Sequence, residues 1–175
     1  MNTFNLTYQN EDDRAYGLAG MAISLAALDA LDNVVFVSLD SDGPMVHFTH
    51  SYYLCGSPVL SPKAVWANMV NNFNLTSAMV LSNVMARSIV RMGHEVPEEI
   101  MAELRREMVR EGRDSCSLDE DEVTQLYNRA RNYLHRIFHN ERLHPAIDEL
   151  VRTLGRRRTM SGSEIADELH LLQIL

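Results

Sequence analysis

The sequence predicts a mainly α-helical fold of the α+β class, with one small β-hairpin near its N-terminus. Apolar side chains recur with the helical period of 3.6 over residues 123–138, and start and stop signals divide most of the remaining chain into further helices. Only residues 34–50 combine strand-like apolar runs with a central turn. The chain has 175 residues, 46% of them hydrophobic, which is enough apolar material for one folded domain.

The first ten residues are polar, and we expect them to form a lead-in to a single domain over residues 11–175. Asp12 or Asp13 is suited to cap the first helix, because a carboxylate at that position accepts a hydrogen bond from a free helix amide. The Ala- and Leu-rich run that follows predicts a helix to about Leu31.

The hairpin comes next along the chain. Residues 34–39 read Val-Val-Phe-Val-Ser-Leu, an apolar run typical of a buried strand. Asp-Ser-Asp-Gly-Pro at 40–44 is a turn cluster. Residues 45–50 alternate enough to form the returning strand.

Two helices are predicted in the middle of the chain. Ser61 is placed as an N-cap, and the proline after it suits the first helical position. The first of these helices is expected to reach Phe73, followed by a break at residues 74–77 and a second helix to Met92. Gly93 is then well placed to end the second helix.

Four further helices are predicted from their terminal signals. Pro97 opens a charged helix that ends at Gly112, and the Ser-Leu-Asp-Glu string at 117–120 is a capping box for the long periodic helix. A helix from Pro145 to Leu154 is expected to stop at the following glycine. Ser-Gly-Ser-Glu at 161–164 is a second capping box, before a terminal helix.

Charge and composition exclude several classes of protein. The chain carries 16 basic and 24 acidic residues, a net charge of −8, which argues against a broad nucleic-acid surface because phosphate contacts need clustered Lys and Arg. Residues 15–28 are apolar but fall short of the ~20 residues that cross a bilayer, and acidic residues precede them, so neither a membrane span nor a secretory signal is expected. Cys55 and Cys116 are too few for a disulfide framework, which favours a reducing cytoplasmic setting.

Four segments of the C-terminal half form an ordered series. They read Leu-Tyr-Asn-Arg-Ala-Arg at 126–131, Ile-Phe-His-Asn-Glu-Arg-Leu at 137–143, Ile-Asp-Glu-Leu-Val at 147–151 and Thr-Met-Ser-Gly-Ser-Glu-Ile at 159–165. This series resembles the closing helices of the FtsH-type ATP-dependent zinc metallopeptidases. Ala-Arg-Ser-Ile-Val at 86–90 is similar to that family's Ala-Arg-x-Met-Val helix. The resemblance implies the fold of an FtsH-type peptidase domain, a helical bundle with a small sheet.

The resemblance extends to the first helix, where the family carries Ala-x-His-Glu-Ala-Gly-His-Ala. Residues 15–22 here read Ala-Tyr-Gly-Leu-Ala-Gly-Met-Ala. In the family the two histidines bind zinc and the glutamate activates the zinc-bound water. Gly17, Leu18 and Met21 stand at those three positions, and the alanine-arginine anchor places Ala78 at the third ligand. None of these side chains suits a hydrolytic zinc site, so the resemblance implies an inactive relative with no metal or other cofactor.

Loss of the ligands and of the base predicts a non-catalytic protein that binds or scaffolds a protein or peptide partner. The strand that runs past the family's active site corresponds to Met45, Val46, His47, Phe48 and Thr49, and an edge strand can add an extended peptide through main-chain hydrogen bonds. Two alternatives stay open. One is an active metallopeptidase or other hydrolase with non-standard ligands, and the other is a structural subunit of a homo-oligomer, since the family works as a ring.

His135 and His139 are the other pair of residues that suggests a metal site. Four residues apart on a helix, they share a face and could bind one ion. They also flank the apolar stripe beside Arg131, Arg136 and Arg142. A solvated helix flank is therefore the favoured interpretation, and no metal site is predicted there.

Two smaller features have simpler interpretations. His47 and His50, three apart on a strand, are expected to face opposite sides of it and not to chelate together. The run Arg156-Arg157-Arg158 is expected to be a solvated loop and not a phosphate site, with an acidic partner as the alternative.

Overall fold

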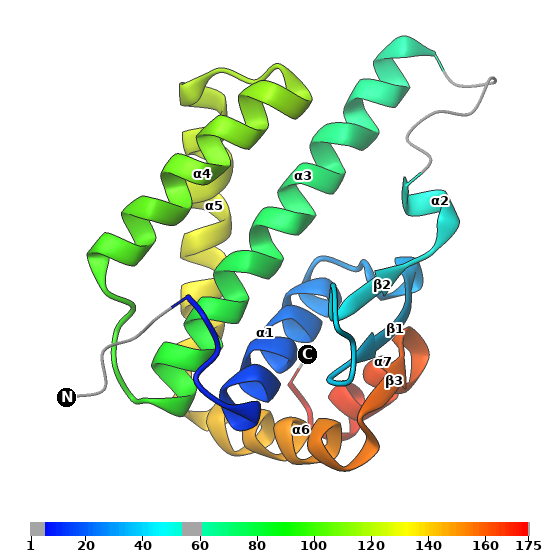
Figure 1. Ribbon diagram of the computed structural model, residues 1–175, viewed down its shortest axis with the longest axis vertical. Coiled ribbons are helices and arrows are strands. Elements are labelled where there is room, and N and C mark those ends of the chain that lie inside the picture. Colours follow the sequence, from blue (N-terminus) through cyan, green and yellow to red (C-terminus); the bar gives the residue numbers. More distant parts are fainter. Residues whose placement is uncertain (1–5, 54–60, 175) are drawn as a thin grey trace.

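The computed structural model describes residues 6–53 and 61–174, and these form a mainly helical fold with one small antiparallel sheet (Figure 1). The predicted fold class, mainly helical with a little β-structure near the N-terminus, is confirmed. The helices are α1 Glu11–Ala27, α2 His50–Tyr53, α3 Pro62–Met85, α4 Glu98–Cys116, α5 Glu120–Phe138, α6 His144–Arg157 and α7 Gly162–Leu171. The strands are β1 Val34–Ser38, β2 Val46–Phe48 and β3 Thr159–Ser161.

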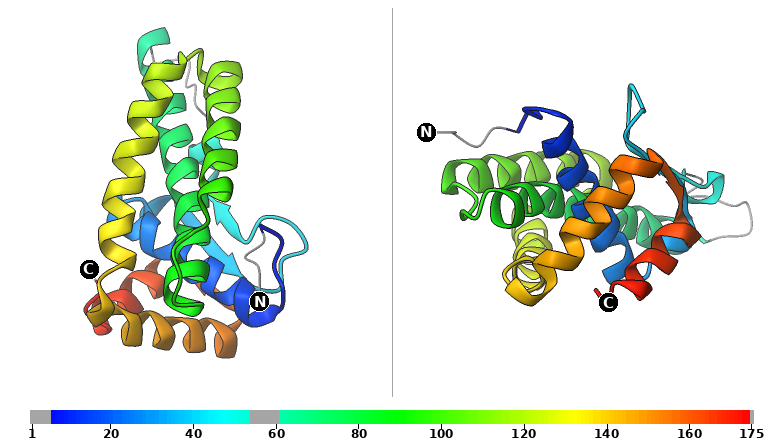
Figure 2. Two further views of the ribbon diagram at one scale, coloured as in Figure 1. Left: turned by 90° about the vertical axis from the view of Figure 1, so that its left-hand side faces the viewer. Right: turned by 90° about the horizontal axis from the view of Figure 1, so that it is seen from below.

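The elements divide into a tall helical part and a broader base. Helices α3, α4 and α5 stand side by side, while α1, α6, α7 and the sheet gather at the lower end (Figure 1). Helix α6 crosses beneath α1, and α7 lies next to the sheet (Figure 2). Among the residues that the structure describes, no helix is both long and apolar enough to cross a membrane.

Helix α1 begins and ends at residues other than those predicted. Its N-cap is Asn10, whose side chain accepts a hydrogen bond from the Asp13 amide at 2.8 Å. The proposal of Asp12 or Asp13 as the cap is wrong, because the Asp13 carboxylate is buried and engaged elsewhere. The helix ends at Ala27 and not at about Leu31, and the left-handed backbone of Asp29 (φ 54°) turns the chain before β1.

Helices α1 and α3 come almost into backbone contact. A Cβ atom on Gly20 would overlap the carbonyl oxygen of Ser82, and one on Gly17 would lie 2.6 Å from the Asn83 amide nitrogen. Both glycines are buried. The small side chains of the α1 sequence therefore determine how closely α1 packs against α3 in the core.

The predicted hairpin is confirmed, but its second strand is shorter than residues 45–50, because β2 ends at Phe48 and His50 begins α2 instead of lying on the strand. The hairpin is also part of a larger sheet. Strand β1 lies between β2 and β3 and pairs antiparallel with both. The third strand, Thr159–Ser161, was not predicted, since three residues are too few to display a strand pattern. Met160 at its centre is fully buried.

Helix α3 runs without interruption through the break that we predicted at residues 74–77. Leu75 and Ala78 are buried there, and the Thr76 hydroxyl donates to the Asn72 carbonyl one turn earlier at 2.9 Å. Burial of one face thus outweighs the weak helix propensity of this polar stretch. Beyond Met85 the helix widens into a π-helical turn over Ala86–Arg91.

Cap positions in the C-terminal half were partly predicted. The box that opens α5 pairs Asp119 with Glu122, two residues later than predicted, because Ser117 (φ 55°) ends α4 in a left-handed conformation. The box at Ser161 and Glu164 is confirmed.

Two predicted stops are too early. Helix α4 passes Gly112 and continues to Cys116, because Gly112 packs directly against Val123 of α5. Helix α6 passes Gly155 and ends at Arg157, since glycine inside a helix carries only a modest cost.

Candidate functional site

The first candidate region is the part of α1 that matches the peptidase motif. Leu18 is fully buried, Gly17 is buried, and Met21 is partly exposed. The space that a side chain at Gly17 would occupy is filled by Asn83 and Tyr8, which are joined by a hydrogen bond of 2.7 Å from the amide to the phenol oxygen. A metal ligand projecting from position 17 would displace both.

Ala78, the matching position of the third ligand, lies on α3 and is buried. It borders a cavity of about 450 Å³ near the C-terminal end of α1, with Ala27, Leu28, Ala130 and Tyr133 among the lining residues. Gly17 lies opposite Asn83, five residues further along α3. Five residues span about 7.5 Å of helix axis, so Ala78 and Gly17 are not directly opposite each other.

A buried ion pair lies one helical turn before Gly17. Arg87 donates to the two carboxylate oxygens of Asp13 at 2.9 and 2.7 Å, and the two side chains are 1% and 2% exposed. Arg87 also donates to the carbonyls of Leu6 and Thr7 at 3.1 Å. The residues just before α1 are therefore bound to the core through this arginine.

The environment of Asp13 favours its charged form. Burial by itself would raise the pKa of this carboxyl group, but hydrogen bonds from Arg87 and the Gln9 amide, with the charges of Arg87 and Arg91, outweigh it and lower the pKa below its usual value. Its oxygens are occupied by these partners. The pair is suited to stabilising the fold and not to proton transfer.

A second buried polar contact joins α1 to α6. The Tyr16 hydroxyl donates to the Asp148 carboxylate at 2.7 Å. Burial, this hydrogen bond and the negative charge of Asp148 raise the pKa of Tyr16 far above its usual value. The phenol therefore keeps its proton and acts as a fixed donor.

The second candidate region is the edge strand β2. In the sheet order β2-β1-β3, β2 has only β1 as a neighbour among the described strands. The Ser38 amide donates to the Met45 carbonyl, and the Thr49 amide donates to the Asn33 carbonyl, each at 2.8 Å. Because main-chain groups alternate in direction along an antiparallel strand, the N–H and C=O groups of Val46 and Phe48 point away from β1.

Aromatic side chains lie on and beside this edge strand. Phe48 stacks on Tyr52 of α2 with centroids 3.9 Å apart, and Tyr53 meets Phe48 edge-on at 6.3 Å. His47 stacks on Phe36 of β1 at 4.2 Å. Tyr53 is 62% exposed. Of the predicted residues Met45 to Thr49, Val46, His47 and Phe48 thus form the edge strand, with Met45 and Thr49 next to it in the chain and an aromatic surface beside it. Met45 and Val46 are buried, whereas His47 and Phe48 are partly exposed.

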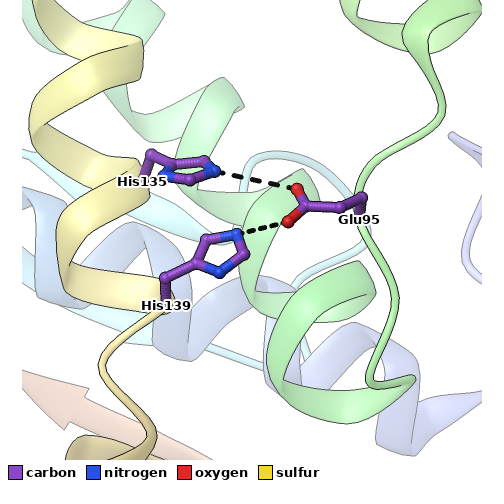
Figure 3. A group of neighbouring side chains, drawn as sticks. All are labelled: Glu95, His135 and His139. Atoms are coloured by element: carbon purple, nitrogen blue, oxygen red, sulfur yellow. Dashed lines mark ion pairs between the residues drawn. The ribbon is translucent and has the colours of Figure 1, made fainter.

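The third candidate region brings His135 and His139 together with a residue that we did not predict. Glu95 approaches His139 at 2.8 Å and His135 at 3.7 Å, measured from its carboxylate oxygens to the Nε2 atoms (Figure 3). The two imidazole rings stack with centroids 3.8 Å apart. Glu95 comes from the segment before α4, forty residues earlier, so no local spacing could indicate it.

The arginine run at 156–158 is paired with acidic groups. Arg156 donates to Glu149 at 3.2 Å, Arg157 to Glu164 at 2.5 Å, and Arg158 to Asp40 at 2.6 Å. Arg156 and Arg157 lie within α6 and not in a loop. Intramolecular pairing of this kind argues against a phosphate site.

Cys116, the cysteine that the structure describes, takes no part in these regions, because it is buried at the end of α4. Cys55 lies outside the described residues.

Neither the models of known protein families nor the curated proteins that we compared with the chain give a match. Its relation to the FtsH-type peptidases therefore rests on the motifs in its own sequence, and we treat that relation as a proposal.

Proposed function

We propose that this protein is a non-catalytic relative of the FtsH-type peptidase domain that binds an extended, unfolded polypeptide at the edge of β2. The observation that carries the proposal is the position of β2 at the edge of the sheet, where the partly exposed Phe48 turns its main-chain groups away from β1, beside the aromatic rings of Tyr52 and Tyr53. Pairing of an extended segment with such an edge is a general mode of peptide recognition.

The packing of α1 supports the non-catalytic part of the proposal. A hydrolytic zinc site of the family's kind needs two imidazoles, a carboxylate base and an open coordination position. Gly17 and Leu18 are buried, and Asn83 fills the space beside Gly17. The position that would hold the metal is occupied by core packing.

The geometry of the edge limits the affinity. Val46 is 4% exposed, so Phe48 supplies the two accessible main-chain groups, and two hydrogen bonds at about 1 kcal/mol each supply about 2 kcal/mol. That corresponds to a dissociation constant of only ~30 mM. Contacts between apolar side chains of the peptide and the Tyr52–Tyr53 surface must supply the remainder, at about 0.5–1.5 kcal/mol per aromatic pair. We expect dissociation constants on the order of 0.1–1 mM.

Fluorescein-labelled, unfolded casein tests both parts of the proposal. We expect its anisotropy to rise when the protein is added, and we expect no fragments after prolonged incubation. Chelator-sensitive cleavage would contradict the non-catalytic assignment. Absence of binding at a protein concentration of 1 mM would contradict the peptide-binding assignment.

Two variants at one position separate main-chain from side-chain recognition. Phe48→Pro removes both the ring and the outward-facing amide proton, but leaves the main-chain hydrogen bonds between β1 and β2 in place. Phe48→Ala removes the ring and keeps the amide. Casein should therefore bind about tenfold more weakly to Phe48→Pro than to Phe48→Ala, which corresponds to ~1.4 kcal/mol. Equal losses in the two variants would exclude strand addition.

A further inference from the structure

We propose that Glu95, His135 and His139 form a binding site for one divalent transition-metal ion of the zinc type. Ligand atoms of the three side chains all lie within 4.8 Å of one another, and Figure 3 shows them pointing toward a common space. The two histidines are one turn apart at the end of α5, so both project from the same helix face. The site is separate from β2 and does not depend on the peptide-binding proposal.

The backbone around Glu95 is held in place. Ser88, which is buried in the π-helical turn, donates from its hydroxyl to the His94 carbonyl at 3.0 Å, and its own carbonyl accepts from the His94 amide at 3.0 Å. Gly93 turns the chain with a φ of 69°, a conformation that glycine adopts without strain. Glu95 therefore follows a backbone that is positioned before any ion arrives.

The histidines are also on a rigid support. Helix α5 keeps its hydrogen bonding to the end, since the His139 amide donates to the His135 carbonyl at 2.9 Å. The backbone that carries both rings is therefore fixed before an ion binds. Ligands carried by helices and fixed turns lose little entropy on binding, which favours chelation.

The donor set indicates the class of ion. Two imidazoles and one carboxylate are typical ligands of zinc and its neighbours, whereas calcium and magnesium prefer oxygen donors only. Tetrahedral ligands about 2.05 Å from zinc lie about 3.3 Å from one another. The separations of 2.8 Å from His139 to one Glu95 oxygen and 3.7 Å from His135 to the other fall on either side of that value, and all the ligand atoms lie within 4.8 Å of one another.

Space for a further ligand lies beside the site. Glu95 and His139 line a cavity of about 440 Å³, together with His94, Glu141 and His144. A water molecule occupies about 30 Å³ of liquid, so this cavity has room for a water molecule or a small anion beside Glu95 and His139. A zinc ion held by three protein ligands takes a fourth ligand of this kind.

The competing explanation is an ion pair alone. Glu95 is 67% exposed, and an exposed pair with His139 would contribute little to stability and bind no metal. That explanation requires only the 2.8 Å contact with His139. A metal site requires His135 as well, so the two explanations predict different effects of replacing His135.

Isothermal titration of the chelator-treated, tag-free protein with zinc chloride decides between them. We expect one equivalent to bind in the natural protein. Loss of a group outside the ligand shell already costs 10–100-fold in affinity, so His135→Ala and His139→Ala should each weaken binding at least 100-fold. His170→Ala, which replaces an exposed histidine of α7, is the matched control and should leave the affinity unchanged.

Cobalt gives a second readout that does not depend on affinity. Cobalt bound by two imidazoles and a carboxylate should produce visible d–d absorption, which His135→Ala and His139→Ala should abolish. Circular dichroism of each variant verifies that it remains folded. The proposal would be overturned if the natural protein bound no zinc, or if zinc binding persisted undiminished in a folded His135→Ala variant.

Discussion

The pair formed by Asp13 and Arg87 allows a quantitative test of how the N-terminal segment is held. Asp13→Asn removes the charge with almost no change in shape, and leaves a buried guanidinium without its counter-ion. Breaking a buried pair on one side costs about 3–5 kcal/mol. Asp12→Asn is the matched control, because Asp12 is 61% exposed and pairs with Arg91 at 2.7 Å. An exposed pair contributes about 0–1 kcal/mol.

Urea denaturation followed by circular dichroism measures both free energies of unfolding. We expect Asp13→Asn to lose about 3–5 kcal/mol at pH 7 and Asp12→Asn at most about 1 kcal/mol. A loss below about 1 kcal/mol in Asp13→Asn would refute the assignment of Arg87 as a buried charge that depends on Asp13.

The pH dependence of the same experiment provides an independent measurement. The folded pKa of Asp13 is lowered, so its stabilising contribution is fully present above the unfolded value of about 3.9. It is lost as the pH falls through the folded pKa. The gap in unfolding free energy between the natural protein and Asp13→Asn should therefore narrow below about pH 4. A gap that stays constant down to the acid transition would contradict the lowered pKa.

Three further substitutions test the packing. Gly20→Ala places a methyl group against the Ser82 carbonyl and should destabilise the protein by about 3 kcal/mol in urea denaturation; a loss below about 0.5 kcal/mol would mean that α1 and α3 are further apart. Tyr16→Phe removes the hydrogen bond to Asp148 and should lower the free energy of unfolding by about 1.5–3 kcal/mol in the same measurement. An unchanged free energy of unfolding would contradict this and would mean that water replaces the phenol oxygen as the partner of Asp148. Phe138→Ala leaves a cavity at a fully buried position and should cost about 3–5 kcal/mol, seen as a lower thermal midpoint.

Features that depend on short stretches of chain were predicted well. The apolar stripe of α5 places Val123, Tyr127, Leu134 and Phe138 in the core as its period requires. The hairpin was predicted because its turn and both strands lie within residues 34–50. In each case the physical cause, burial of one face or closure of a tight turn, acts between neighbours in the sequence.

Features that depend on distant contacts were not predicted. The polar residues around Thr76 suggest a break, but packing against α1 and α5 keeps α3 helical. Strand β3 exists because β1 offers it a partner, and nothing in Thr159–Ser161 itself indicates this. Glu95 joins His135 only through the packing of α5 near the start of α4. Such contacts are set by the whole fold, and one sequence alone does not display them.

The central place of β1 has a consequence for the order in which the molecule can assemble. Phe36 of β1 pairs with Ser161 of β3, 125 positions later in the chain. At synthesis rates of about 5–20 residues per second, roughly 6–25 seconds separate the appearance of the two strands. During that interval β1 and β2 can form only a two-stranded hairpin, which is marginally stable by itself. The sheet is therefore among the last parts of the fold to be completed. Until β3 has been synthesised, the edge of β1 that later pairs with β3 is free to pair with other strands.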